Sequence, residues 1–145
     1  MVRKKDVDVL LVEDDPGDVE LTREAMKDSK MLINLHVVGN GVEAMKYLKK
    51  EGSYKDASKP DMILLDLNLP KKDGREVLDE IKSDTRLKSI PVVVLTTSQD
   101  EWDFKRCYEL GANCCVTKPI GLEEFAKIVK SIREFWLTIV KLPSL

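Results

Sequence analysis

Two short apolar runs in the sequence end in carboxylates. Glu13 and Asp14 directly follow the run Val7–Val12, and Asp66 directly follows the run Met62–Leu65. Runs of this length are too short for a helix and are typical of strands that are buried on both faces. The carboxyl ends of parallel strands lie at one edge of a sheet, where such sheets bind their ligands. Taken alone, Asp66 is equally well explained as a turn residue, which is a common role of aspartate.

Two further apolar runs end in groups of another kind. Thr96 closes the β-branched run Pro91–Thr96, and Lys118 directly follows the run Asn113–Thr117. Each has an ordinary explanation, Thr96 as a strand residue and Lys118 as an exposed cation. The acids of the first run have one too, because acids at a helix start complement its dipole. We favour a shared role, because coincidence poorly explains suitable residues at the ends of four strands.

The combined set suits one kind of chemistry. Three carboxylates in one crevice repel one another, so their ionised forms need a cation or a raised pKa. Carboxylate oxygens with room for water are the ligands that Mg²⁺ prefers. Lys118 and Thr96 add a charge and a hydroxyl donor, which suit the equatorial oxygens of a phosphoryl group. Asp66 is then the acceptor, because carboxylates form aspartyl phosphates.

Strand and helix signals alternate along the whole chain, which predicts an α/β fold with a parallel sheet covered on both faces. Right-handed crossovers favour the strand order 2-1-3-4-5, the flavodoxin-like (βα)5 fold. The predicted helices begin at Pro16, Gly41, Gly74, Asp100 and Leu122, and the last runs to about Val140. The predicted strands are Val7–Val12, Leu35–Val38, Met62–Leu65, Pro91–Thr96 and Asn113–Thr117.

Composition sets the remaining limits. The chain has 145 residues, 43% of them hydrophobic and 34% charged, which predicts one globular domain over 1–145 with no separate output domain. Its net charge of −2 gives no reason to expect nucleic-acid binding. No apolar run approaches the roughly 20 residues that span a bilayer, so we expect no membrane segment and a cytoplasmic location. The three cysteines lack CxxC spacing and are interpreted as small hydrophobes.

Five motifs occur in order along nearly the whole chain. They are VED at Val12–Asp14, LLDLNLP at Leu64–Pro70, KKDG at Lys71–Gly74, LTTS at Leu95–Ser98 and TKP at Thr117–Pro119. With these motifs the chain resembles the receiver domain of two-component response regulators. It resembles especially the single-domain regulators that partner phytochrome-type histidine kinases.

The resemblance implies a role for each acid of the crevice. Asp66 is the phosphoacceptor, which a histidine kinase phosphorylates in a Mg²⁺-dependent reaction. Asp14 and Asp66 bind Mg²⁺ directly, together with the backbone carbonyl of Asn68, and Glu13 acts through water. Asp15 lies outside the acidic pair.

The resemblance also implies roles for Lys118 and Thr96 in the reaction and for Thr96 in the switch that follows it. The bond between Lys118 and Pro119 is expected to be cis, as is usual in the family. Receivers usually carry an aromatic residue or histidine three positions before the lysine, and this chain carries Cys115 there. We therefore expect a switch that lacks its aromatic half and signals differently or more weakly.

The last predicted helix is longer than the domain needs. A strand of five residues spans about 17 Å, whereas a helix of this length spans about 29 Å. We expect the excess to overhang the domain. Exposed aromatic residues mark interfaces, so we predict a symmetric homodimer through Phe135, Trp136, Ile139 and Val140. Output is then phosphorylation-dependent protein interaction.

Three other functions share parts of this pattern. A flavin-binding flavodoxin has the same fold, but the acids that follow Val12 repel a phosphate unless a metal intervenes. An aspartate-nucleophile phosphatase has a second aspartate two residues after the first, where this chain has Asn68. A passive Mg²⁺-binding or phosphate-sink interaction module is the third alternative.

Overall fold

The computed structural model describes residues 6–27, 32–139 and 141–143, and in this part of the chain strands and helices alternate as predicted. The strands are β1 (Val7–Val12), β2 (Ile33–Val38), β3 (Met62–Asp66), β4 (Val92–Thr96) and β5 (Cys114–Thr117). The α-helices are α1 (Pro16–Lys27), α2 (Gly41–Leu48), α3 (Gly74–Ser83), α4 (Glu101–Glu109) and α5 (Leu122–Glu134). A 3₁₀ turn at Gly52–Tyr54 lies in the predicted loop before β3, and a π turn, η2 (Phe135–Ile139), follows α5.

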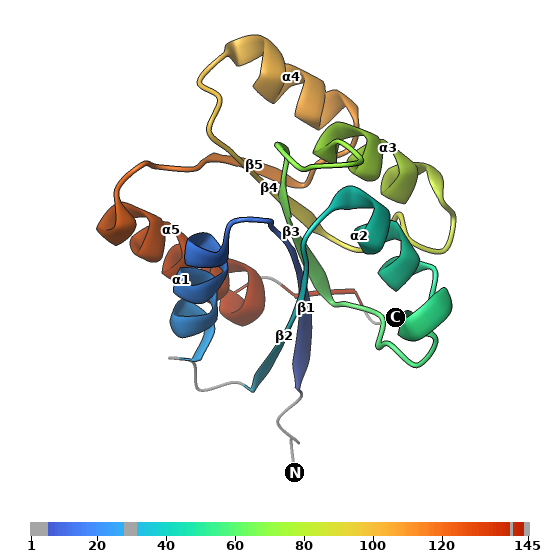
Figure 1. The fold of residues 1–145 in the computed structure, drawn as a ribbon. Helices are drawn as coiled ribbons and strands as arrows, with labels where there is room; N and C mark the ends of the chain where they lie inside the picture. The colour runs from blue at the N-terminus through green and yellow to red at the C-terminus, as the bar shows by residue number, and fades with distance from the viewer. Residues whose placement is uncertain (1–5, 28–31, 140, 144–145) are drawn as a thin grey trace.

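The five strands form one parallel sheet of order β2-β1-β3-β4-β5, which confirms the predicted flavodoxin-like topology. Figure 1 shows α1 and α5 together on one side of the sheet and α2 and α3 on the other. Every strand runs in the same direction, so all five carboxyl ends lie at one edge. The side chains that follow the strands are therefore gathered at that edge.

Side chains of the central strands alternate between two cores. Val9 and Leu64 belong to the core under α1 and α5, whereas Leu10 and Ile63 belong to the core under α2 and α3. This alternation follows from the period of two residues in a strand. Both faces of β3 and β4 are completely buried, which explains their continuous apolar runs.

Cys114 and Cys115 follow the same rule as the central strands. Cys114 packs against the core under α1 and α5, and Cys115 packs against the opposite core. These neighbours therefore face opposite sides of the sheet. Both thiols are free, as is that of the buried Cys107.

Side-chain caps fix the start of three helices. Asn40 accepts a hydrogen bond from the backbone N–H of Glu43, which caps α2. Asp73 and Asp100 cap α3 and α4 in the same way. Such caps satisfy amide groups that have no partner within the helix, so they fix where each helix leaves the sheet edge. Gly111 follows the end of α4 with φ of +104°, a conformation that glycine adopts readily at helix ends.

The C-terminal extension differs from its prediction. The α-helix ends at Glu134, and a π turn changes which of the following side chains face the domain. Trp136 packs against the core under α1 and α5, so the prediction that it overhangs the domain is wrong, and Leu142 packs against the same core. Phe135 is 51% exposed, as predicted. Val140 lies outside the described residues.

Candidate functional site

The carboxylates that follow β1 and β3 converge at the carboxyl edge of the sheet. Val12 and Leu65 are register partners in these neighbouring strands, which brings the residues after them together. One carboxylate oxygen from each of Glu13, Asp14 and Asp66 lies within 4.8 Å of the others. Glu13 and Asp66 are buried and Asp14 is exposed, so the cluster opens to solvent on one side. The predicted convergence of these acids is confirmed.

Lys118 reaches the same cluster from the end of β5. Its Nζ lies 2.5 Å from Oε1 of Glu13 and 3.1 Å from Oδ2 of Asp66. The lysine side chain is only 9% exposed. Its backbone N–H donates to the carbonyl of Thr96 at 2.6 Å, which fixes the chain as it leaves the sheet. The ammonium group therefore balances part of the negative charge in the crevice.

The bond between Lys118 and Pro119 is not cis. The structure has no cis peptide bond among the residues that it describes, so the expectation drawn from the family is wrong for this chain. The trans form is also the preferred one for an X-Pro bond. Lys118 reaches Asp66 without it, because the hydrogen bond to Thr96 already directs the chain toward the crevice.

Asp18 is a member of the site that the sequence analysis missed. Its Oδ2 lies 2.6 Å from Nζ of Lys118, closer than Asp66 does. Asp18 stands in the first turn of α1, where an acid has the ordinary role of complementing the helix dipole. The position of Asp18 in the first turn was a signal that could have found it. Side chains of a helix lean toward its N-terminus, which here lies near the strand ends.

Burial and close packing shift the pKa values of these groups. Burial raises the pKa of Glu13 to about 9, and its hydrogen bond with Asp66 acts in the same direction. Burial opposes the charged form of Lys118, but hydrogen bonds with Asp18 and Glu13 raise its pKa above the ordinary value. Burial also opposes the charged form of Asp18, yet its hydrogen bond with Lys118 brings its pKa below the ordinary value. Glu13 is thus the acid of this network that most readily holds a proton.

Glu13 also carries an unusual oxygen. Among the described residues, its Oε2 is the one buried side-chain polar atom with no hydrogen-bond partner. Buried polar atoms are normally satisfied by protein or by an ordered water. An orphaned carboxylate oxygen beside two further carboxylates fits a hydrated divalent cation, whose bound water could donate to it.

The loop after β3 shapes the surroundings of Asp66. The backbone N–H of Asn68 donates to Oδ1 of Asp66 at 3.0 Å, and its side-chain amide donates to Oγ1 of Thr97 at 3.2 Å. Asp66 thus has Oδ1 held by the loop and Oδ2 held by Lys118. Gly74 lies directly against this loop, and its N–H donates to the carbonyl of Leu67. The carboxylate is therefore fixed before any reaction.

Thr96 lies at the end of β4, as predicted, with 1% of its surface exposed. Its hydroxyl oxygen accepts a hydrogen bond from the backbone N–H of Ser98 at 3.1 Å. The hydroxyl of Ser98 in turn donates to Asp103 on α4, and Arg75 on α3 pairs with the same carboxylate at 3.2 Å. A chain of polar contacts thus connects Thr96 to α3 and α4.

Cys115 occupies the position where receivers usually have an aromatic residue. Its backbone N–H donates to the phenolic oxygen of Tyr108 on α4 at 3.1 Å. Burial raises the pKa of its thiol to about 12, and the neighbouring Cys107 adds to this effect. Such a thiol is protonated at neutral pH, which agrees with its interpretation as a small hydrophobe.

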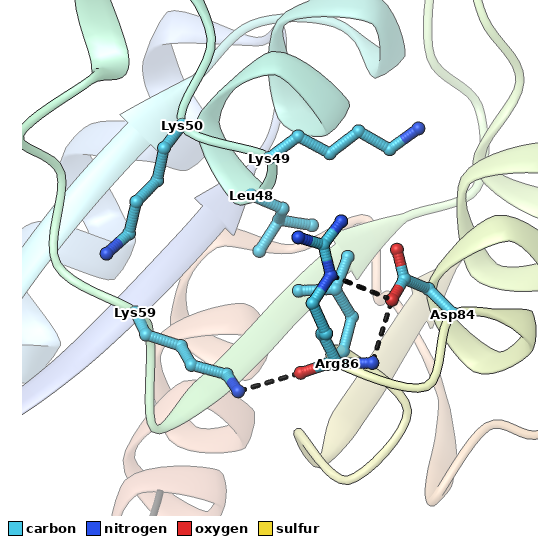
Figure 2. Close-up of a pocket in the computed structure, with 7 residues that line it drawn as sticks. Leu48, Lys49, Lys50, Lys59, Asp84 and Arg86 are labelled. Atoms are coloured by element: carbon cyan, nitrogen blue, oxygen red, sulfur yellow. Dashed lines mark hydrogen bonds and ion pairs between the residues drawn. The ribbon is translucent and has the colours of Figure 1, made fainter.

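A second group of charges lies at the opposite edge of the sheet. A hollow of about 240 Å³ lies near the end of α2 and the start of β3, and Figure 2 shows the residues that line it. Arg86 pairs with Asp84, and Nζ of Lys59 donates to the carbonyl of Arg86 at 2.7 Å. These contacts tie the loops at that edge together, so we assign this cluster a structural role. The residues that line it are Leu48, Lys49, Lys50, Lys59, Asp84, Arg86 and Leu87.

A five-stranded parallel sheet with an acidic pair, an aspartate, a threonine and a lysine at its carboxyl edge defines a receiver module, a class of signalling protein. Residues 9–130 match the family model of the response regulator receiver domain. The chain therefore belongs to the response regulator receiver family.

Its relatives confirm the narrower resemblance. The chain is 49% identical over 136 residues to response regulator Rcp1 of Synechocystis sp., covering 94% of this chain and 92% of that one. It is 53% identical, with a TM-score of 0.94, to the phosphorylated cyanobacterial phytochrome response regulator RcpA, covering 97% and 100% of the two chains. The Mn²⁺-bound form of Rcp1 is 48% identical, with a TM-score of 0.92, and the coverage is 95% and 99%.

Among the residues that the structure describes, none of the helices combines the length and the hydropathy that a bilayer span needs.

Proposed function

We propose that this chain is a stand-alone response regulator of a two-component phosphorelay. A histidine kinase of the phytochrome type transfers a phosphoryl group to Asp66, and the phosphorylated chain signals in the cytoplasm by protein interaction. The observation that carries the proposal is the contact of 3.1 Å between Asp66 and the ammonium of Lys118. It places a fixed carboxylate and a cation at the solvent-facing edge of the sheet.

The acids of the crevice fit a divalent cation, which we propose is Mg²⁺. Asp14, Asp66 and the backbone carbonyl of Asn68 would bind it directly, and Glu13 would act through water. The orphaned Oε2 of Glu13 supports this arrangement, as does the Mn²⁺-bound structure of the relative Rcp1. When bound, the ion would supply positive charge where the transferred phosphoryl group accumulates negative charge.

The side chains of this protein divide the remaining work. An oxygen of Asp66 attacks phosphorus, the P–N bond of the phosphohistidine breaks, and the imidazole leaves with the electron pair of that bond and takes up a proton. Lys118 moves one hydrogen bond from Asp66 to a phosphoryl oxygen, which neutralises the incoming charge. The held geometry of Asp66 removes part of the entropic cost of reaching the reactive arrangement.

The signal begins at Thr96. A phosphoryl group on Asp66 offers the threonine hydroxyl a charged acceptor. Movement of the threonine side chain toward it would break the hydrogen bond with Ser98. The contacts of Ser98 and Arg75 with Asp103 would carry that change to α3 and α4. Cys115 fills the other switch position with a small side chain, so the response depends on the threonine.

A homodimer is the proposed assembly. Phe135 is 51% exposed and lies edge-on to Trp136, with ring centroids 5.8 Å apart. A large exposed aromatic side chain favours an interface, and a symmetric dimer would bring the two copies of Phe135 into the same contact. The sequence also assigns Ile139 and Val140 to this surface, but their side chains lie outside the part of the chain that the structure describes.

Incubation with acetyl phosphate and Mg²⁺, read by intact mass, tests the proposal. The wild type should gain the mass of one phosphoryl group, and Asp66→Asn should gain none. Glu24→Gln is the matched control, because Glu24 is an exposed acid near the end of α1 that pairs with Lys27. Modification that survives Asp66→Asn would refute the assignment of the acceptor.

A phosphate sink is the second candidate, and Cys115 is the observation that favours it. A receiver without the aromatic switch residue could accept phosphate and change its surface little. The wild type with and without beryllofluoride, a phosphoryl mimic, separates the two functions by amide NMR. Shifts on α4 and β5 support signalling, whereas shifts confined to the crevice support the sink.

A further inference from the structure

The ammonium group of Lys118 has three acceptors in this structure, and one of them comes from a helix rather than a strand end. Glu13 lies at 2.5 Å, Asp18 at 2.6 Å and Asp66 at 3.1 Å from Nζ. An ammonium group has three N–H donors, so each donor has one carboxylate. Asp66, at the longest distance, is the weakest of the three contacts.

Dipole complementation does not account for the position of Asp18. Any acid in the first turn of α1 would serve that purpose with its side chain in solvent. The side chain of Asp18 is instead 20% exposed and directed into the crevice toward Lys118. Asp15, three residues earlier, is exposed and accepts a hydrogen bond from the N–H of Gly17 at 3.2 Å. The two acids carry the same charge but only Asp18 bonds the lysine.

Lysine needs such an anchor more than arginine would. Its ammonium is a point charge on a flexible four-carbon stem, so its position is set by its partners. Phosphoryl transfer would take the Asp66 contact away, because the third donor is then needed by a phosphoryl oxygen. Glu13 belongs to the group of carboxylates that fits a cation with Asp14 and Asp66. Asp18 stands outside that group, although its carboxylate lies within 4.8 Å of those of Glu13 and Asp15.

We propose that Asp18 is a positioning residue that holds the Lys118 ammonium group at the site of phosphoryl transfer. This inference rests on the proposed function of Asp66 as phosphoacceptor. Asp18 contacts Lys118 and the acids Glu13 and Asp15, and it acts on the phosphoacceptor through the lysine. It keeps one donor of Lys118 occupied before and after transfer, which leaves another donor free to move from Asp66 to the phosphoryl oxygen.

The test compares Asp18→Asn with the wild type and with Glu24→Gln in the full chain, because Glu24 is an exposed acid of the same helix that pairs with Lys27. Asp18→Asn should lower the phosphorylation rate by phosphoramidate and the affinity for beryllofluoride, both with saturating Mg²⁺, by about tenfold, as loss of a hydrogen bond between charged groups predicts. Glu24→Gln should match the wild type in both. Asp18→Glu keeps the charge and should recover part of the rate. Thermal unfolding checks that every variant is folded.

A double-mutant cycle with Lys118→Met separates positioning from a structural role. If Asp18 acts through the lysine, Asp18→Asn has no further effect on beryllofluoride affinity once Lys118 is replaced. An equal loss in both backgrounds would overturn the proposal. A faster reaction in Asp18→Asn would overturn it too, because Asp18 would then only repel the phosphodonor. Failure of the wild type itself to react would instead reject the proposed function.

Discussion

The Nζ of Lys118 and the Oδ2 of Asp66 lie 3.1 Å apart although the residues are separated by 52 positions and by the whole of β4. The lysine side chain extends from the end of β5 past β4 to reach the end of β3. This contact exists because parallel strands place all of their carboxyl ends at one edge. It joins the proposed acceptor to the cation that would neutralise the arriving charge.

Replacing Lys118 should destabilise the fold, because the ammonium group balances negative charge in the crevice. Lys118→Met leaves buried carboxylates without their cation, so we expect a loss of about 3–5 kcal/mol in unfolding free energy in EDTA. Mg²⁺ should restore more stability to this variant than to the wild type. Urea unfolding with EDTA or Mg²⁺ measures both, and Lys130→Met on the exposed side of α5 is the control. An equal loss in the two solutions would contradict the prediction.

The stability of the metal-free protein should fall with rising pH because of Glu13. Its pKa is about 9 in the folded chain and 4.5 ordinarily. The folded chain thus holds a proton that the unfolded chain has released between these values. The stabilising contribution is complete below pH 4.5 and is lost as pH rises to about 9, by up to about 1.4 kcal/mol per unit.

Urea unfolding in EDTA at pH 6 and pH 8 measures this slope. The wild type should be less stable at pH 8 than at pH 6. In Glu13→Gln the stabilities at the two pH values should be nearly the same. Mg²⁺ binding should also release protons and strengthen with pH, because the ion favours the ionised acids. A slope that is unchanged in Glu13→Gln would assign the titration to another group.

Gly74 should tolerate no side chain. A Cβ at this position would lie 2.5 Å from Cα of Leu67 and 2.6 Å from the carbonyl oxygen of Asp66. Both are backbone atoms of the loop that holds the acceptor. Gly74→Ala should therefore lower the free energy of unfolding by about 1–3 kcal/mol and slow phosphorylation. Gly39→Ala is the matched control, since nothing lies within 4 Å of its added Cβ. Equal melting temperatures for the two variants would refute this account.

The proposed dimer should depend on Phe135. Phe135→Ser removes the exposed aromatic ring and should shift the chain toward the monomer in sedimentation experiments, with its fold intact. Trp102→Ser is the control, because it removes another exposed aromatic, 63% exposed, from a different helix. A wild type that is monomeric with and without phosphate would exclude the dimer.

The strands and their order were predictable because their signals are local. Runs such as Val92–Thr96 are apolar at every position, and a buried parallel strand requires that. The site followed from the same logic. Glu13, Asp66, Thr96 and Lys118 each stand at a strand end, and topology alone brings strand ends together.

The remaining features depend on packing that no local pattern encodes. Topology places the first turn of α1 near the crevice, but whether Asp18 faces Lys118 or solvent depends on how the helix packs. Trp136 packs on the core because a π turn interrupts the helical spacing that predicted its exposure. The trans bond before Pro119 differs from the cis bond that is usual in the family. That expectation came from the resemblance and not from a physical requirement of this chain.

The central claim is that Asp66 carries the phosphoryl group, and reductive trapping tests it at the residue itself. After reaction with acetyl phosphate and Mg²⁺, borohydride reduces an aspartyl phosphate to homoserine, which peptide mapping locates. We predict homoserine at position 66 in the wild type, strongly reduced without Mg²⁺. Homoserine at position 14 or 18 in its place, or no conversion despite a gain of phosphoryl mass, would contradict the account.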